Sequence, residues 1–279
     1  MSDSTIVSFE FFPPKTDQGQ ENFKASRQAL KQFNPAYYSV TFGAGGSTQD
    51  GTLEAIKEIQ QEADTQAAPH ISCITSSKAS ISALLEDYHA AGVQRLVCLR
   101  GDRPDNTAIR GELHYASELV AFIRAETGQQ FHIEVAAYPE VHPESSSAAN
   151  DLDNFRRKLD AGADGAITQY FYNIDAYTDF MDRCQQHNID VPVVPGIMPI
   201  TNYTQLARFS SACGAEIPRW LDKRLQDFGD DLDSIRAFGI DVVTRLCERL
   251  LEQGAPGLHF YTLNRSEASI AICKQLDLN

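Results

Sequence analysis

The chain has 279 residues, of which 42% are hydrophobic and 22% are charged, a composition that supports a sizeable buried core and is not that of a disordered protein. Its formal net charge of −14 argues against general nucleic-acid binding, which needs a basic surface. No apolar stretch approaches the roughly 20 residues of a membrane span, and the N-terminus lacks the pattern of a signal peptide. We therefore expect a cytoplasmic protein with no membrane or nucleic-acid partner.

Six cysteines lie mostly within apolar strand or helix patterns and form no C-x-x-C pair: Cys73, Cys98, Cys184, Cys213, Cys247 and Cys273. This usage is typical of reduced cysteines that serve as packing residues. No second His or Cys stands at metal-ligand spacing from His70, so we expect no metal site.

Apolar segments with strand character alternate with helical periodicity along the chain. The predicted strands span residues 6–12, 37–42, 69–74, 96–102, 133–138, 165–172, 191–199 and 258–263. The predicted helices span residues 20–33, 77–91, 151–161, 175–187, 203–213 and 231–253, with others beginning near residue 50 and containing residues 119–123. This alternation predicts an α/β fold, a (β/α)8 TIM barrel in one domain over residues 1–279. A doubly wound Rossmann sheet is the weaker alternative, because the glycine-rich turn at residues 43–46 is not G-x-G-x-x-G.

The tetrapeptide Leu99-Arg100-Gly101-Asp102 closes the fourth predicted strand. Function in a barrel collects at the carboxyl ends of the strands, and a glycine there lets a ligand approach the backbone closely. Arg100 and Asp102 are therefore candidate site residues, although a salt-bridged turn would also explain them.

Glu10 stands among phenylalanines in the first predicted strand. Strand alternation places it on one face with Ser8 and Phe12, away from Phe9 and Phe11, so we expect Glu10 to point into the barrel. Apolar surroundings would raise its pKa and keep a proton available near neutral pH, which suits a general acid. The alternative interpretation is a core glutamate paired with a cation.

Further polar side chains stand at predicted strand ends: Thr41, His70, Tyr138, Gln169, Asn264 and Arg265. Packing alone does not readily explain so many of them. His70 by itself is more typical of a hydrogen-bonded core histidine than of a base. The Gln169 amide suits recognition of a heterocycle's donor and acceptor edge, and it equally suits ordinary hydrogen bonding inside a barrel.

Asp151, Asn154, Arg157 and Lys158 form a polar stripe on the helix predicted at residues 151–161. Such a stripe is usually a solvated helix face. Arg157 and Lys158 are nonetheless where an acidic protein could hold a phosphate, through charge-assisted hydrogen bonds.

With these residues assembled, the sequence resembles the methylenetetrahydrofolate reductases of the short bacterial type over nearly its whole length. The motifs that carry the resemblance are SFEFFPPK at 8–15, LRGD at 99–102, AAYPEVHP at 136–143, ITQYF at 167–171, PGI at 195–197 and FYTLNR at 260–265. Two places depart from the family pattern: the turn at residues 45–48 and a slightly long loop at residues 103–112.

The resemblance implies a barrel that binds FAD without a Rossmann motif. It implies hydride transfer from NADH or NADPH, through the flavin, to methylenetetrahydrofolate in a ping-pong reaction that yields methyltetrahydrofolate. Glu10 matches the family's acid, which opens the substrate's five-membered ring to an iminium. Asp102 matches a carboxylate near the flavin and pterin, whose negative charge stabilises that cation.

Flavin contacts carry over from the family to Thr41, His70, Arg100, Gly101, Asp102, Tyr115, Ala116, Tyr138, His142, Asp151, Asn154, Arg157 and Lys158. Substrate contacts carry over to Glu10, Asp102, Gln169, Gln205, Phe209 and Arg265. The family also suggests a homo-oligomer, and we expect no regulatory domain.

Two alternatives stay open at this point. One is a folate-dependent barrel that transfers a methyl group with a corrinoid or zinc partner. The other is a catalytically silent protein that binds folate or flavin.

Overall fold

The computed structural model describes residues 5–42, 49–62, 65–102 and 111–278. The glycine-rich turn at 43–46, the family departure at 45–48 and most of the loop at 103–112 lie outside these residues. The strands are β1 (Ile6–Phe11), β2 (Tyr37–Val40), β3 (Ala67–Ser72), β4 (Arg95–Leu99), β5 (His132–Ala137), β6 (Gly165–Thr168), β7 (Val193–Val194), β8 (Gly196–Ile197) and β9 (Gly257–Tyr261).

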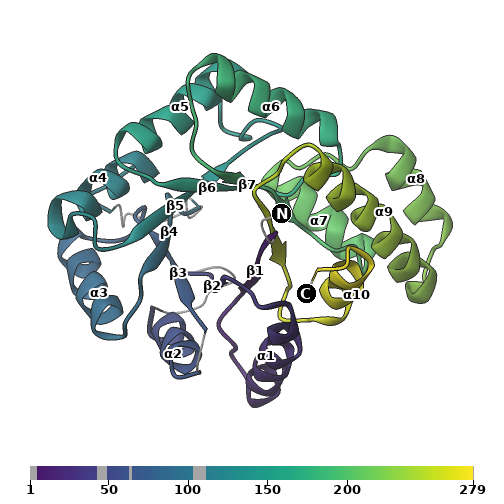
Figure 1. Ribbon diagram of the computed structural model, residues 1–279, viewed down its shortest axis with the longest axis horizontal. Helices are drawn as coiled ribbons and strands as arrows, with labels where there is room; N and C mark the ends of the chain where they lie inside the picture. Colours follow the sequence, from purple (N-terminus) through teal and green to yellow (C-terminus); the bar gives the residue numbers. More distant parts are fainter. Residues whose placement is uncertain (1–4, 43–48, 63–64, 103–110, 279) are drawn as a thin grey trace.

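All the strands run parallel, in the order β7-β6-β5-β4-β3-β2-β1-β9-β8. The predicted seventh strand is split at Pro195, with β7 paired to β6 and β8 paired to β9. Gly196 is required at this split, because a Cβ would lie 2.2 Å from the Thr168 carbonyl and 2.6 Å from the Tyr261 ring. The two halves bring the ends of the sheet together, which confirms the predicted (β/α)8 barrel (Figure 1).

Helices surround the strands (Figure 1). They are α1 (Asp17–Leu30), the 3₁₀ turn η1 (Lys31–Phe33), α2 (Gln49–Gln60), α3 (Lys78–Ala90), α4 (Ala116–Thr127), α5 (Ala148–Asp160), α6 (Ile174–Gln186), α7 (Tyr203–Cys213), α8 (Arg219–Asp227), α9 (Leu232–Glu252) and α10 (Glu267–Gln275). Side chains such as Thr16, Ser77 and Asn202 accept hydrogen bonds from first-turn amides and so fix where helices begin. The sequence patterns did not predict α8, because its buried residues, Leu221 and Leu225, stand in an otherwise polar segment.

The main core lies between the strands and the helices. Phe9 and Phe11 of β1 are buried there, against Phe23, Tyr38 and Phe260, with ring centroids 5.4 to 6.2 Å apart. The intervening Ser8 and Glu10 face the barrel interior, where both lie near His259 of β9. The predicted alternation along this strand is therefore confirmed.

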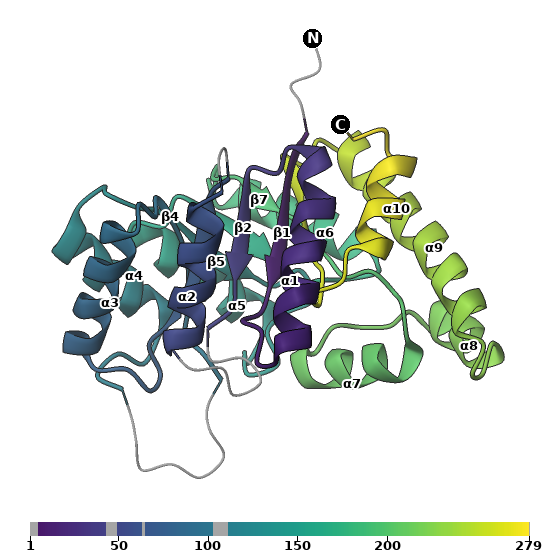
Figure 2. The same cartoon turned by 90° about the horizontal axis from the view of Figure 1, so that it is seen from below.

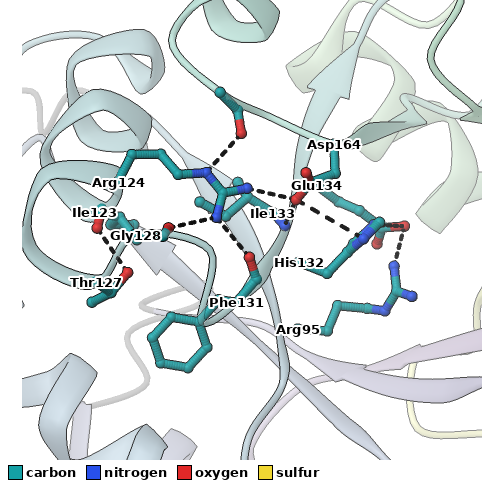
Figure 3. A network of polar contacts seen from close by, with 11 residues as sticks. Arg95, Ile123, Arg124, Thr127, Gly128, Phe131, His132, Ile133, Glu134 and Asp164 are labelled. Atoms are coloured by element: carbon teal, nitrogen blue, oxygen red, sulfur yellow. Dashed lines mark hydrogen bonds and ion pairs between the residues drawn. The ribbon is translucent and has the colours of Figure 1, made fainter.

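A polar network lies at the amino ends of β4, β5 and β6 (Figure 3). The Arg124 guanidinium donates to the carbonyls of Gly162, Gly128 and Phe131 and pairs with Asp164 at 2.6 Å. Asp164 also accepts from the Ile133 N–H at 2.7 Å. One side chain thus joins α4 to the starts of β5 and β6.

Replacing Arg124 with Met is expected to lower the free energy of unfolding by about 2 kcal/mol, because it leaves Asp164 and the part-buried carbonyls of Gly162 and Phe131 without their donor. Chemical denaturation monitored by circular dichroism measures the change. Arg245, whose side chain is 77% exposed and 3.8 Å from Asp241, provides the control. Arg245→Met is expected to have almost no effect, and an equal effect of the two substitutions would contradict this role for Arg124.

Candidate active site

The carboxyl ends of the strands meet at one face of the barrel, where they bring the candidate residues together. Figure 2 shows the strands running toward this face, with α7 lying beside it. Glu10 and His70 lie near the ends of their strands, and other candidates follow directly after strands: Thr41, Arg100, Tyr138 and Gln169. Gln205 and Phe209 lie on α7, and Arg265 follows β9.

Glu10 points into the barrel, as predicted, and its side chain is 18% exposed. Its Oε2 atom lies 3.2 Å from His70 Nε2 and 3.8 Å from His259 Nε2. The predicted rise in its pKa is wrong. Burial does raise the pKa, but the charge interactions and hydrogen bonds of His70 and His259 outweigh burial and lower it to about 2.

The directions of the neighbouring side chains explain the low pKa of Glu10. Phe9 and Phe11 point outward into the main core, so the carboxyl group of Glu10 faces the imidazoles of His70 and His259 instead of their rings. His259 is fully buried, with Nδ1 2.7 Å from Ser8 Oγ and Nε2 3.3 Å from Ser39 Oγ. Sequence reasoning missed His259, although its alternation with Phe260 along β9 would have placed it on the inner face.

Arg100 forms a bidentate ion pair with Glu144, at 2.7 Å for each contact. Glu144 lies in the loop between β5 and α5, so this pair links two strand ends. Gly101 has a φ of +87°, and a Cβ there would lie 3.0 to 3.2 Å from side-chain atoms of Ile74 and Ser72. Asp102, the next residue, is exposed at the same face.

The loop between β5 and α5 is strained and tightly held. Val141 has a φ of +70°, a conformation that a β-branched residue rarely adopts, and such strain concentrates at functional sites. The rings of Tyr138 and His142 meet edge to face at 4.6 Å. Asp151 is buried and accepts from Ser145 Oγ at 2.7 Å and from the His142 N–H at 3.3 Å.

The polar stripe of α5 is only partly solvated. Arg157 is exposed and donates to Asn154 Oδ1 at 3.2 Å. Lys158 is half-buried, and its Nζ donates to the Ala136 carbonyl at 2.5 Å. Burial lowers the pKa of Lys158 to about 8, despite the opposing effect of Asp151. A solvated helix face does not account for Asp151 and Lys158, which turn toward the end of β5.

One buried polar atom at this face, Thr41 Oγ1, makes no hydrogen bond within the described part of the chain, and the Nε2 atom of His70 has Glu10 as its neighbour at 3.2 Å. Buried polar atoms are normally paired, so an atom without a partner at a barrel mouth is suited to a bound ligand. Tyr115 is 57% exposed, and its carbonyl lies 3.7 Å from Cys73 Sγ, beside the end of β3. Ala116 begins α4 next to it.

Polar contacts fasten helix α7 to the barrel, one of them from Cys213 Sγ to Tyr170 OH at 3.5 Å. Tyr170 OH lies 3.0 Å from Ser210 Oγ, and Glu140 Oε2 accepts from the Glu216 N–H at 2.8 Å beyond the helix. A small cavity between these contacts is lined by Tyr138, Pro139, Glu140, Val141, Gln169, Tyr170, Cys213, Gly214 and Ala215. Phe209 and Gln205 are half-buried on α7, and Arg265 is exposed.

Within the described ranges, the chain has neither a membrane-spanning helix nor a cluster of metal-ligating side chains. None of the helices combines the length and hydropathy that a bilayer span requires. The same residues hold no group of three or more His, Cys, Asp or Glu side chains arranged to bind a metal ion.

Comparison with solved structures supports the fold. A protein from Clostridium thermocellum, described as uncharacterized and as binding two copies of 5-methyl-5,6,7,8-tetrahydrofolic acid, superposes with a TM-score of 0.69 at 19% sequence identity, over 98% of this chain and 95% of that one. A Coxiella burnetii dihydropteroate synthase in complex with pteroic acid superposes with a TM-score of 0.54 at 9% identity, over 98% of this chain and 92% of the other. At such identities the likeness shows the fold alone.

Comparison with protein sequences shows the family. The 5,10-methylenetetrahydrofolate reductases of Pectobacterium carotovorum subsp. carotovorum and Escherichia coli (strain K12) are each 40% identical over 270 residues, which is 97% of this chain and 89% and 90% of those proteins. "Methylenetetrahydrofolate reductase (NADH) 1" of Arabidopsis thaliana is 37% identical over 287 residues, covering 98% of this chain and 48% of that protein. The family model for methylenetetrahydrofolate reductase matches residues 1–277. This chain therefore belongs to the methylenetetrahydrofolate reductase family of oxidoreductases.

Proposed function

We propose that this chain reduces 5,10-methylenetetrahydrofolate to 5-methyltetrahydrofolate, with FAD as cofactor and NADH or NADPH as electron donor, in a ping-pong reaction. Family membership supports the reaction class. The Clostridium thermocellum barrel, which binds a methylated folate, supports a folate ligand for this fold. The observation that carries the proposal is Glu10, a carboxyl group held inside the barrel between two imidazoles at the face where the other candidates gather.

The residues at this face fit a flavin dinucleotide. Thr41 Oγ1 is buried without a hydrogen-bond partner among the described residues, and Lys158 offers a half-buried ammonium group for an anion. The residues that would hold FAD are Thr41, His70, Arg100, Gly101, Asp102, Tyr115, Ala116, Tyr138, His142, Asp151, Asn154, Arg157 and Lys158. When bound, FAD accepts a hydride from the reduced nicotinamide and delivers it to the folate.

Glu10 must gain a proton before it can act as an acid. With a pKa of about 2, its carboxyl group is ionised at neutral pH in the arrangement described above. His70 makes the largest of the contributions that lower this pKa. A ligand that engages His70 Nε2 weakens that contribution, and burial then raises the pKa. We infer that Glu10 Oε2 holds its proton when the cofactor and substrate fill the site.

The other substrate contacts have distinct roles in the proposal. Asp102 places a negative charge where the substrate becomes cationic. The Gln169 amide recognises the pterin edge through paired donor and acceptor groups. Phe209 stacks on an aromatic ring of either substrate, and Gln205 and Arg265 hold the rest of the folate. The Arabidopsis relative is named for NADH, which favours NADH as the donor here.

The visible absorption spectrum of the purified protein tests the proposal. We expect a flavin spectrum that bleaches on anaerobic addition of NADH or NADPH and recovers when methylenetetrahydrofolate is added. A colourless protein that takes up no added FAD would overturn the proposal and favour a methyl-transferring folate barrel or a silent binding protein. A flavin that bleaches but does not recover with the folate would overturn the assigned substrate.

A further inference from the structure

The segment Thr262–Arg265 folds back on the end of β1 as it leaves β9. The regular pairing of the two strands ends at Glu10 and Tyr261. Leu263 and Asn264 then adopt left-handed backbones, with φ of +51° and +58°. A leucine is rarely found in this region, so the contacts around the turn must hold it there.

The side-chain amide of Asn264 hydrogen-bonds to the backbone of Phe12 as a neighbouring strand would. Its Oδ1 accepts from the Phe12 N–H at 2.9 Å, and its Nδ2 donates to the Phe12 carbonyl at 2.8 Å. The side chain is buried, and the Asn264 carbonyl accepts from Ser26 Oγ of α1 at 3.1 Å. One amide therefore continues the sheet by two hydrogen bonds beyond the point where the backbone ladder stops.

Thr262 binds the backbone of Glu10, two residues before Phe12. Its Oγ1 and its N–H both donate to the Glu10 carbonyl, at 2.6 and 3.2 Å. The same Oγ1 accepts from the Asn264 N–H at 3.1 Å. Thr262 and Asn264 thus form one clamp on the backbone of Glu10 and Phe12.

The clamp also sets where Arg265 leaves the turn, because the Arg265 N–H donates to the Thr262 carbonyl at 3.0 Å. Glu10 and Arg265 both belong to the set assigned above to the folate. Misplacing a reacting group by about 1 Å can cost up to about 100-fold in rate. The clamp therefore fixes two folate-facing side chains relative to each other.

We propose that Asn264 and Thr262 are positioning residues for the folate half of the reaction, acting through the backbone of Glu10 and through Arg265. The proposal rests on the function proposed above. The proposal predicts an effect on the folate half-reaction alone, because in the proposed function the reduction of the flavin by the nicotinamide does not use Glu10 as an acid.

The test compares Asn264→Gly with Asn188→Gly. Glycine keeps the left-handed backbone without strain, so only the amide is lost. Asn188, at the end of α6, has a φ of +55° and is exposed, so it controls for loss of a left-handed asparagine. In anaerobic stopped-flow measurements, we expect Asn264→Gly to slow flavin re-oxidation by methylenetetrahydrofolate by about tenfold to 100-fold, with flavin reduction unchanged. Asn188→Gly is expected to change neither rate.

The variants Thr262→Val and Thr262→Ser form a second test that leaves Asn264 unchanged. Valine removes the hydroxyl that holds the Glu10 carbonyl, and serine restores it. We expect the valine variant to lose folate-dependent re-oxidation selectively and the serine variant to recover it.

Hydrogen–deuterium exchange gives a readout that does not require turnover. Loss of the Asn264 amide is expected to speed exchange at the Phe12 N–H, because that group loses its acceptor. A purely structural clamp would impair both half-reactions equally, and a dispensable one would impair neither. If the wild-type protein performs both half-reactions, either result in the variants overturns this inference and leaves the proposed function standing. A wild-type protein without folate-dependent re-oxidation overturns the proposed function instead.

Discussion

Replacing Glu10 with Gln is expected to slow flavin re-oxidation by methylenetetrahydrofolate by about 100- to 10,000-fold, the range that a general acid typically contributes. Glutamine nearly preserves the shape of the side chain between His70 and His259 but holds no transferable proton. The rate of flavin reduction by NADH or NADPH should stay unchanged, because the proposed role of Glu10 as an acid is confined to the folate step. Anaerobic stopped-flow absorbance of the flavin measures each rate separately.

Glu134 provides a matched control, because it is also a buried carboxylate inside the barrel, near the amino ends of the strands. It accepts from Tyr37 OH at 2.7 Å and pairs with Arg95 at 2.9 Å. Glu134→Gln is expected to lower the stability of the protein without slowing one half-reaction more than the other. Equal loss of both half-reactions in Glu10→Gln would refute the role of Glu10 as a folate-specific acid.

Sequence periodicity predicted the barrel and the direction of Glu10 well, because both depend on local patterns. Alternation along β1 separates Phe9 and Phe11 from Glu10, and parallel strands then bring every strand end to one face. The split of the seventh strand at Pro195 could not be predicted in this way. At the split, the hydroxyl group of Tyr261 on β9 donates to the Thr168 carbonyl of β6, a contact between strands far apart in the sequence.

The electrostatics of the site were harder to predict than its location. The pKa of Glu10 depends on His70 of β3 and His259 of β9, which reach it only through the closed barrel. Likewise, Arg100 pairs with Glu144, 44 residues later in the chain. The residues next to Glu10 in the sequence do not include the imidazoles that lie nearest to it in space. The apolar run around Glu10 therefore predicted a raised pKa, whereas the two imidazoles lower it.

Replacing Asp102 with Asn is expected to slow the folate half-reaction by about 30-fold or more, which corresponds to about 2 kcal/mol for the loss of one preorganised charge. The carboxylate follows Gly101 at the end of β4, where the left-handed glycine fixes the direction of the chain. In the proposed reaction, its negative charge stabilises the substrate most strongly when the substrate is cationic. Asparagine keeps the size of the side chain and removes the charge, so the loss is expected in rate more than in folate binding.

Asp233→Asn is the matched control, because the Asp233 side chain is 95% exposed at the start of α9. Within the described part of the chain, its ion-pair partner is Arg236 on the same helix. That substitution is expected to leave both half-reactions unchanged. Single-turnover re-oxidation at saturating methylenetetrahydrofolate separates the chemical rate of Asp102→Asn from its affinity for the folate. An unchanged rate at saturation would remove Asp102 from the mechanism, and a loss confined to affinity would make it a binding residue whose charge does not act on the cationic substrate.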